Sequence, residues 1–160
     1  MLRVADIPKP LLPELVARYA LQFIRVADAA PIPHSFWGAP EAGISSHRLF
    51  ARADTPVHSV LHELAHLVCM TTQRRFALQT NAGGDANEEC AVCYLQVVLA
   101  DHIGGFGRAR AFADMDSWGY SFREGSARAW FLGDGLSAQQ WLLSNALLHP
   151  SLQPTWRLRD

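Results

Sequence analysis

Cysteine is scarce in this sequence, which contains three cysteines among 160 residues. Three thiols cannot all be paired within the chain, so we expect a reducing compartment and no disulfide framework. Charge is scarce too: Asp, Glu, Lys and Arg make up 18% of the residues, and the formal net charge is −1. With half of the residues hydrophobic, this composition indicates a folded chain without a polyanion-binding surface, and nucleic acid is not an expected partner.

Long apolar segments are also missing. The longest apolar run, from Cys90 to Ala100, is interrupted by Gln96 and is too short to cross a bilayer. The first residues include Asp6 and several early prolines where a signal peptide would need an apolar run. We therefore expect a cytoplasmic protein without a membrane partner, folded as one domain over residues 1–160.

The sequence does contain H-E-x-x-H, formed by His62, Glu63 and His66 in an otherwise apolar segment. On a helix, residues four positions apart lie on the same face, so both imidazoles can reach one metal ion while Glu63 is free to handle a proton. His58 lies on the same face, but three turns are too long for it to share that ion, so a role beside the ligands is expected. The alternative is a chance match whose histidines are ordinary helix residues.

The helix that carries the motif is predicted from about Pro56 to Met70 or Thr71. Asp54 or Thr55 is expected to cap it, and Pro56 suits its first turn. A second helix is predicted from Ala86 to His102, apolar on every side past its first turn.

Two acids, Glu88 and Glu89, open this second helix. Acids favour helix N-termini through the dipole, which explains either one without a special role. The functional interpretation is that one of them is a third metal ligand, with a fourth position left for water. We choose Glu88, because it continues the stripe of Ala91, Val92 and Leu95 that should face the motif helix, and we keep Glu89 as the alternative.

Cys90 and Cys93 form C-x-x-C in this second helix, but the chain has no second such pair for a zinc ribbon. They are interpreted as small buried hydrophobic residues, with a redox role as the alternative.

The remaining pattern predicts a mainly helical α+β domain with a small sheet beside the motif helix. Ala29 to Gly43 is too rich in proline and glycine for a long helix, and its aromatic residues are expected to pin it to the core. Tyr120 is a weaker candidate for polarising a substrate carbonyl. The other elements expected from spacing and capping boxes are helices over Pro10 to Asp28, 106–115, 122–132 and 138–148, and extended segments at Ile44 to Ala53 and Phe76 to Leu78.

His62, Glu63 and His66, with an Asn-Glu pair opening the next core helix, resemble the gluzincin branch of zinc metallopeptidases. The resemblance covers roughly residues 44–102 and implies a zincin-like fold acting on a peptide or protein. It also implies zinc held by His62, His66 and Glu88, with Glu63 as the general base that activates water. Val92 stands where many such enzymes have an acid that orients a histidine, so Gln96, Asp85 or a backbone carbonyl is expected in that role.

A second resemblance belongs to another reaction class. The segments 47–51 and 59–66, with Cys69, Arg74, Arg75 and 84–86, are similar to the bacterial elongation factor P hydroxylase family. This resemblance implies an Fe(II) enzyme that hydroxylates a protein side chain, because two histidines and one carboxylate suit Fe(II) as well as zinc. A metal-binding protein without catalysis is the remaining alternative.

Overall fold

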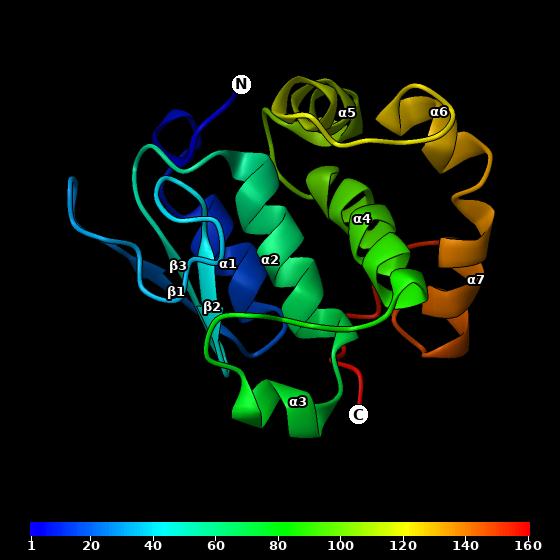
Figure 1. Cartoon of the computed structure of the whole chain (residues 1–160), viewed down its shortest axis with the longest axis horizontal. Helices are drawn as coiled ribbons and strands as arrows, with labels where there is room; N and C mark the ends of the chain where they lie inside the picture. The colour runs from blue at the N-terminus through cyan, green and yellow to red at the C-terminus, as the bar shows by residue number, and fades with distance from the viewer.

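Two apolar helices, α2 (Val57–Cys69) and α4 (Ala86–Ala100), pack against each other at the centre of the fold (Figure 1). The computed structural model describes residues 1–160. It confirms an α+β architecture that is mainly helical, with seven α-helices and one small three-stranded sheet. The sheet lies on the outer side of α2, and α7 lies on the outer side of α4. The other elements are the 3-10 helix η1 (Val4–Asp6), α1 (Leu11–Ala17), β1 (Gln22–Arg25), β2 (Gly43–Ser45), β3 (Arg48–Ala51), α3 (Thr72–Ala77), α5 (Gly107–Trp118), α6 (Ala127–Leu132) and α7 (Leu136–Ser144).

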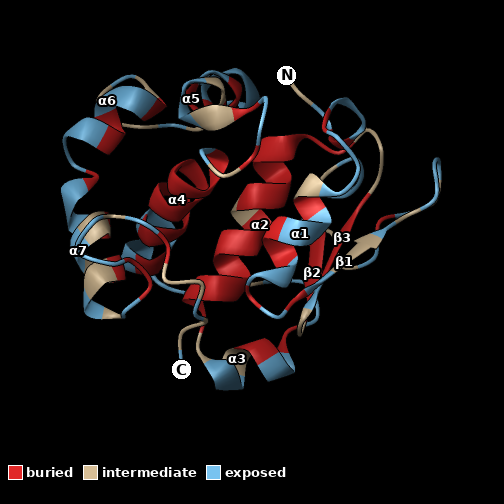
Figure 2. Ribbon diagram, turned by 180° about the vertical axis from the view of Figure 1, so that it is seen from behind, coloured by how far each residue is buried: buried red, intermediate tan, exposed pale blue.

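Every residue of α2 except His62 is buried, and this helix is almost entirely red in Figure 2. Large apolar side chains such as Leu61 and Leu64 are fully enclosed, and each such burial stabilises the fold by about 1.5–3 kcal/mol. The predicted position of this helix is confirmed, but its predicted cap is wrong. Pro56 occupies the N-cap without a side-chain bond, and the Thr55 hydroxyl instead accepts the amide of Arg52.

The sheet has the strand order β1-β3-β2, with β1 parallel to β3 and β2 antiparallel to it. Leu49 of the central strand pairs with Phe23 on one side and Ile44 on the other. The segment Ile44 to Ala53, expected as one extended piece, forms two strands because the chain turns at Ser46, whose φ is 54°. Strands β2 and β3 contact α2, so the expected sheet beside the motif helix is confirmed.

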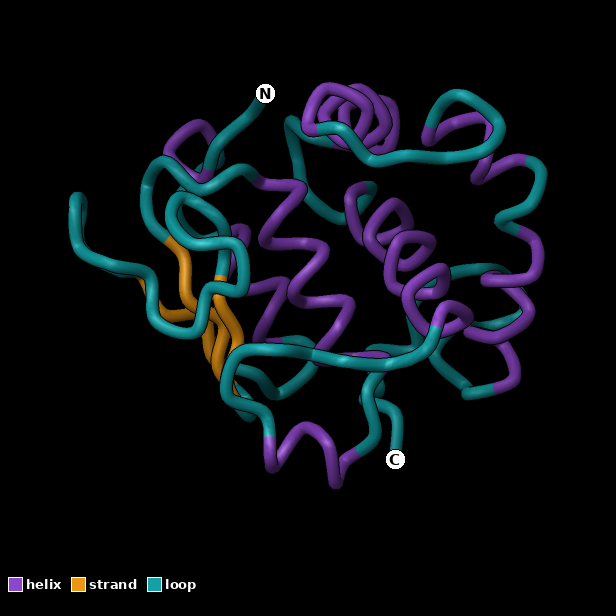
Figure 3. The backbone as a smooth tube through the Cα atoms, viewed as in Figure 1, coloured by secondary structure: helices purple, strands orange, loops and turns teal.

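Two predicted elements are wrong. The single helix expected over Pro10 to Asp28 ends at Ala17, and the chain then enters β1 after Ala20, which has a left-handed φ of 58°. The strand expected at Phe76 to Leu78 is instead the end of the short helix α3, which begins where the Thr71 hydroxyl accepts the Arg74 amide. Figure 3 shows the long loops that follow β1 and α3.

The C-terminal third is helical, as expected, but α6 and α7 begin at other residues. Ser126, rather than Ser121, caps α6 by accepting the Ala129 amide, and α7 begins at Leu136, before the predicted capping box. One hydrophobic cluster of 42 buried residues runs from Val4 to Leu148 and includes residues of every α-helix except α3. None of the helices combines the length and the apolarity that a bilayer crossing requires.

Candidate metal centre

Two histidines and one glutamate converge where α2 and α4 lie side by side. His62 and His66 are one turn apart on α2, and their ring centroids are 4.7 Å apart. The Nε2 atom of His62 lies 3.3 Å from Glu89 Oε1, and the Nε2 atom of His66 lies 3.4 Å from Glu89 Oε2. One potential ligand atom from each residue lies within 4.8 Å of the others. The two separations from Glu89, 3.3 and 3.4 Å, are close to those between neighbouring ligands of a tetrahedral zinc ion, about 3.3 Å for bonds of about 2.0 Å.

This geometry favours Glu89, the alternative, over Glu88 as the third potential ligand. Glu88 is buried, and its carboxylate accepts two hydrogen bonds from Arg74 Nη1, at 2.9 and 2.7 Å. Glu89 faces both histidines. The apolar stripe along α4, on which the choice of Glu88 was based, does not reveal that Glu88 has a cationic partner of its own.

Gln96 fixes the protonation of His62. The Gln96 amide nitrogen donates to the backbone carbonyl of His58 and to the Tyr120 hydroxyl, so its Oε1 atom is the acceptor that faces His62 Nδ1 at 3.0 Å. His62 Nδ1 therefore carries a proton. Burial opposes a charge on His62, but Tyr120 and the hydrogen bonds with Cys93 and Glu89 outweigh it and hold the pKa of His62 well above its usual value, so Nε2 is also protonated in the metal-free chain and faces Glu89 as a donor. Of the residues expected to orient a histidine, Gln96 is the one that does so. Asp85 instead caps α4 by accepting the Glu88 amide.

This donor set is suitable for a metal ion. A cation that replaces the Nε2 proton of His62 would meet the lone pair of that atom and the carboxylate of Glu89, which lie 3.3 Å apart. A proton or a metal cation between them is needed to make this contact favourable. Burial, followed by the charge of His62, lowers the pKa of His66 to about 4, so His66 is neutral near pH 7 and able to act as a ligand. Its Nδ1 atom is buried without a hydrogen-bond partner.

The carboxylates in the site have different environments. Burial tends to raise the pKa of Glu89, but the hydrogen bond with His62 and the charge of His66 outweigh it and hold the pKa below its usual value. Burial raises the pKa of Glu63 to about 7. Glu63 makes no hydrogen bond or ion pair with another side chain, and it forms part of the wall of both cavities beside the histidines. Its carboxylate is therefore free to act on a bound molecule.

Two cavities of about 250 Å³ each meet at these residues, and His62, Glu63 and Glu89 line both of them. One cavity extends toward the loop before α4, and the other toward the loop after α5. Because they lie on either side of the cluster, an elongated molecule can pass across it. The further residues lining the first cavity are Phe36, Trp37, His66, Thr80, Asn81, Ala82 and Gly83, and those lining the second are Trp37, Glu41, His58, Ser59, Cys93, Trp118, Gly119, Tyr120 and Ser121.

Aromatic side chains at the cavity mouth were not anticipated as site residues. Phe36 and Trp37 were expected to pin their loop to the core, yet they are 53% and 66% exposed. Trp37 packs edge-on against Trp118, whose indole nitrogen donates to Glu41 at 3.0 Å. The signal for this role was available in the sequence, since bulky aromatic residues on an irregular loop also mark binding surfaces.

His58 and Tyr120 lie next to the cluster without joining it. The Nδ1 atom of His58 is 3.4 Å from the Tyr120 hydroxyl, which places His58 beside the ligands, as expected. Burial raises the pKa of Tyr120 to about 12, so its hydroxyl stays protonated near neutral pH. Tyr120 lines the second cavity, where its predicted role toward a substrate carbonyl stays a prediction.

The cysteines only partly follow their interpretation as buried hydrophobic residues. Cys69 and Cys93 are buried, whereas Cys90 is exposed, and all three are free thiols. Cys93 lines the second cavity near His62.

Comparison of the chain with protein-family models, with curated proteins and with solved structures finds no match. The function therefore has to be inferred from the geometry of this site.

Proposed function

We propose that this chain is a zincin-like metal-dependent hydrolase in which His62, His66 and Glu89 hold zinc and Glu63 is the general base. The observation that carries the proposal is the convergence of three ligand atoms within 4.8 Å of one another, beside a buried carboxylate that has no partner. Two imidazoles and one carboxylate, with a position left open, are the ligand set typical of catalytic zinc.

A bound zinc ion would supply a Lewis acid that polarises a carbonyl group and acidifies water. Glu63 accepts the proton of the attacking water and returns it to the leaving amine, because its carboxylate borders both cavities. Gln96 keeps the Nε2 atom of His62 directed into the site. The two cavities leave room for an elongated substrate on both sides of Glu63, which favours a segment of a peptide or protein as the substrate.

Metal content together with one variant tests this proposal. Protein purified without added metal and analysed by elemental mass spectrometry should carry close to one zinc ion per chain. The Glu63→Gln variant should retain the metal and the fold while it cleaves a quenched fluorescent peptide mixture about 10²–10⁴-fold more slowly. Retained zinc without cleavage by either form would identify a metal-binding protein without this activity, and absence of metal from every preparation would refute the proposed centre.

An Fe(II)-dependent hydroxylase acting on a protein side chain is the second candidate. The observation that favours it is that cavities open on both sides of the cluster, so more than one further ligand has room beside the two histidines and the glutamate. Fe(II) oxygenases use such a three-residue set with several open positions, and they consume O₂ and a reductant. Retention of iron rather than zinc, with substrate oxidation that survives Glu63→Gln, would select this candidate over the hydrolase.

A further inference from the structure

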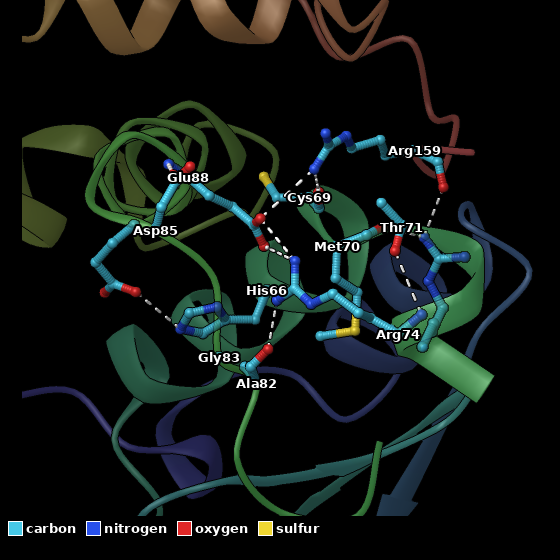
Figure 4. Close-up of polar contacts among 12 residues, drawn as sticks. His66, Cys69, Met70, Thr71, Arg74, Ala82, Gly83, Asp85, Glu88 and Arg159 are labelled. Carbon is cyan, nitrogen blue, oxygen red and sulfur yellow. Dashed lines mark hydrogen bonds and ion pairs between the residues drawn. The ribbon is translucent and has the colours of Figure 1, made fainter. Parts of the chain in front are cut away.

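The two acids at the start of α4 have opposite environments. Glu88 is only 4% exposed, and its carboxylate lies between Arg74, which donates both hydrogen bonds, and Arg159, whose Nη1 atom is 3.5 Å away. Glu89 is half exposed on its side chain and faces His62 and His66. Figure 4 shows the Glu88 carboxylate directed at the two arginines, beside the loop that carries Ala82 and Gly83.

The direction of Glu88 determines the direction of Glu89. Adjacent residues of an α-helix point about 100° apart around its axis, so α4 can present only one of the two acids to the histidines. Arg74 Nη1, which donates to both carboxylate oxygens of Glu88, holds Glu88 on the side of α3 and the C-terminal segment. The same helix rotation brings Glu89 over α2, with each carboxylate oxygen facing one imidazole.

Arg74 is itself fixed relative to the motif helix. The Thr71 hydroxyl caps α3 by accepting the Arg74 amide, and Thr71 directly follows Met70, the C-cap of α2. A short, hydrogen-bonded path thus links the end of α2 to the carboxylate of Glu88. The other guanidinium nitrogen of Arg74 donates to the Ala82 carbonyl, so the same side chain holds the loop that lines the first cavity.

The Glu88 carboxylate lies close to the backbone of the loop before α4, at Gly84. A Cβ atom at Gly84 would lie 3.0 Å from the Glu88 carboxyl group, and the φ of 96° at Gly84 also favours glycine. A buried carboxylate keeps its place when its charge and its lone pairs are matched, and Arg74 matches both.

We infer that Arg74 and Glu88 form a clamp that positions the ligand Glu89, so that both are positioning residues of the metal centre. This inference rests on the proposed function, because it assigns a role toward the metal that His62, His66 and Glu89 are proposed to hold. Neither Arg74 nor Glu88 contacts the metal or the substrate. Their effect reaches the site through the rotation of α4 and through the loop that carries Ala82.

Metal affinity in matched variants tests the clamp. Zinc affinity is measured by competition with a chromophoric chelator, cobalt(II) absorption reports the ligand geometry, and urea unfolding of the metal-free protein reports stability. Arg74→Gln should weaken zinc binding by about 10–100-fold, which is the usual loss for residues that orient metal ligands. It should also change the cobalt spectrum. Arg74→Lys should keep part of the affinity that Arg74→Gln loses, because lysine keeps the charge and a donor for Glu88 but lacks the second nitrogen that donates to the Ala82 carbonyl.

The matched control is Arg108→Gln, which breaks the exposed ion pair with Asp101 at the opposite end of α4. This variant should keep the zinc affinity and cobalt spectrum of the original chain. If Arg74→Gln fails to fold, Arg74→Lys and Glu88→Gln are compared instead, and unchanged affinity in both overturns the inference.

Two further outcomes separate the clamp from the proposed function. If Arg74→Gln lowers the urea midpoint but the folded variant binds zinc as tightly as the original chain, with the same cobalt spectrum, the pair is only structural and the inference is overturned. If the original chain binds neither zinc nor cobalt, the proposed metal centre is refuted and the clamp with it.

Discussion

Gln96 Oε1 accepts a hydrogen bond from His62 Nδ1 at 3.0 Å, and this contact between α4 and α2 leaves Nε2 as the nitrogen of His62 that faces Glu89. Replacing Gln96 with Leu should remove the orienting bond while keeping an apolar side chain of similar size in a fully buried position. Zinc affinity, measured by chelator competition, should fall by about 10–100-fold.

The control for this variant is Gln139→Leu. Gln139 Nε2 donates to the Tyr94 hydroxyl of α4, so the control removes a similar hydrogen bond without touching the histidines. Equal losses of affinity in the two variants would contradict a specific role for Gln96.

Zinc should stabilise the folded chain, because the three ligands are assembled only in the native state. At a free zinc concentration one hundred times the dissociation constant, the free energy of unfolding should rise by about 2.7 kcal/mol. Glu89→Ala should abolish this gain, since it removes one of the three ligand side chains. Thermal unfolding with and without zinc, after chelator treatment, measures the effect; a zinc-dependent shift that survives in Glu89→Ala would place the third ligand elsewhere.

Arg75 should be critical for stability rather than for metal binding. Its guanidinium is 2% exposed and donates to the carbonyls of Leu67, Met70 and Arg159, which ties the end of α2 to the C-terminal segment. A buried carbonyl without a partner costs about 1–3 kcal/mol, so Arg75→Met should lower the free energy of unfolding by about 3 kcal/mol or more.

Urea unfolding of the metal-free protein measures this loss. Arg25→Met, at an exposed arginine of β1, should stay within about 0.5 kcal/mol of the original chain. If Arg75→Met changed the free energy of unfolding by an equally small amount, water would have replaced the guanidinium as the donor to the three carbonyls.

Thiol labelling should distinguish the three cysteines. Cys90 is exposed, while Cys69 and Cys93 are buried, and burial raises the pKa of the Cys69 thiol well above its usual value. A thiol reagent should therefore react with one cysteine in the native chain and with three in denaturant. Cys90→Ser should remove the native reaction, as intact mass measurement would detect; rapid native labelling of Cys69 would contradict the packing of α2.

The helices that carry the site could be predicted from the sequence because their signals are local. Apolar residues surround the histidine motif over about three turns, and α4 is apolar past its first turn, so both helices were expected close to their observed positions.

The strand β1 was missed because its signal is not local. Its residues continue the helical spacing of α1, and the chain turns between the two elements at Ala20, a residue type that gives no turn signal. Pairing with β3 then decides the structure.

The sequence did not favour Glu89 over Glu88 because the interaction that distinguishes them is not local. Glu88 and Glu89 are identical side chains at consecutive positions in the first turn of α4. What separates them is the cation at Arg74, 14 positions earlier, and the one at Arg159, 71 positions later. The Asn87-Glu88 pair, which supported the choice of Glu88, indicates only where the helix begins and not which acid faces the histidines. The orienting role of Gln96 was among the expected options, since its place on α4 follows from helix periodicity.

The bonds that join Arg159 to the end of α2 also have a consequence for the order of folding. The Arg159 side chain donates to the Cys69 carbonyl, 90 positions earlier, and its amide donates to the Val68 carbonyl. Contacts between such distant residues form late, because the intervening chain must first be synthesised and brought together. On the ribosome, α2 and α4 can meet while Arg159 is still inside the exit tunnel. The histidine helix receives its final anchor only when residue 159 has emerged.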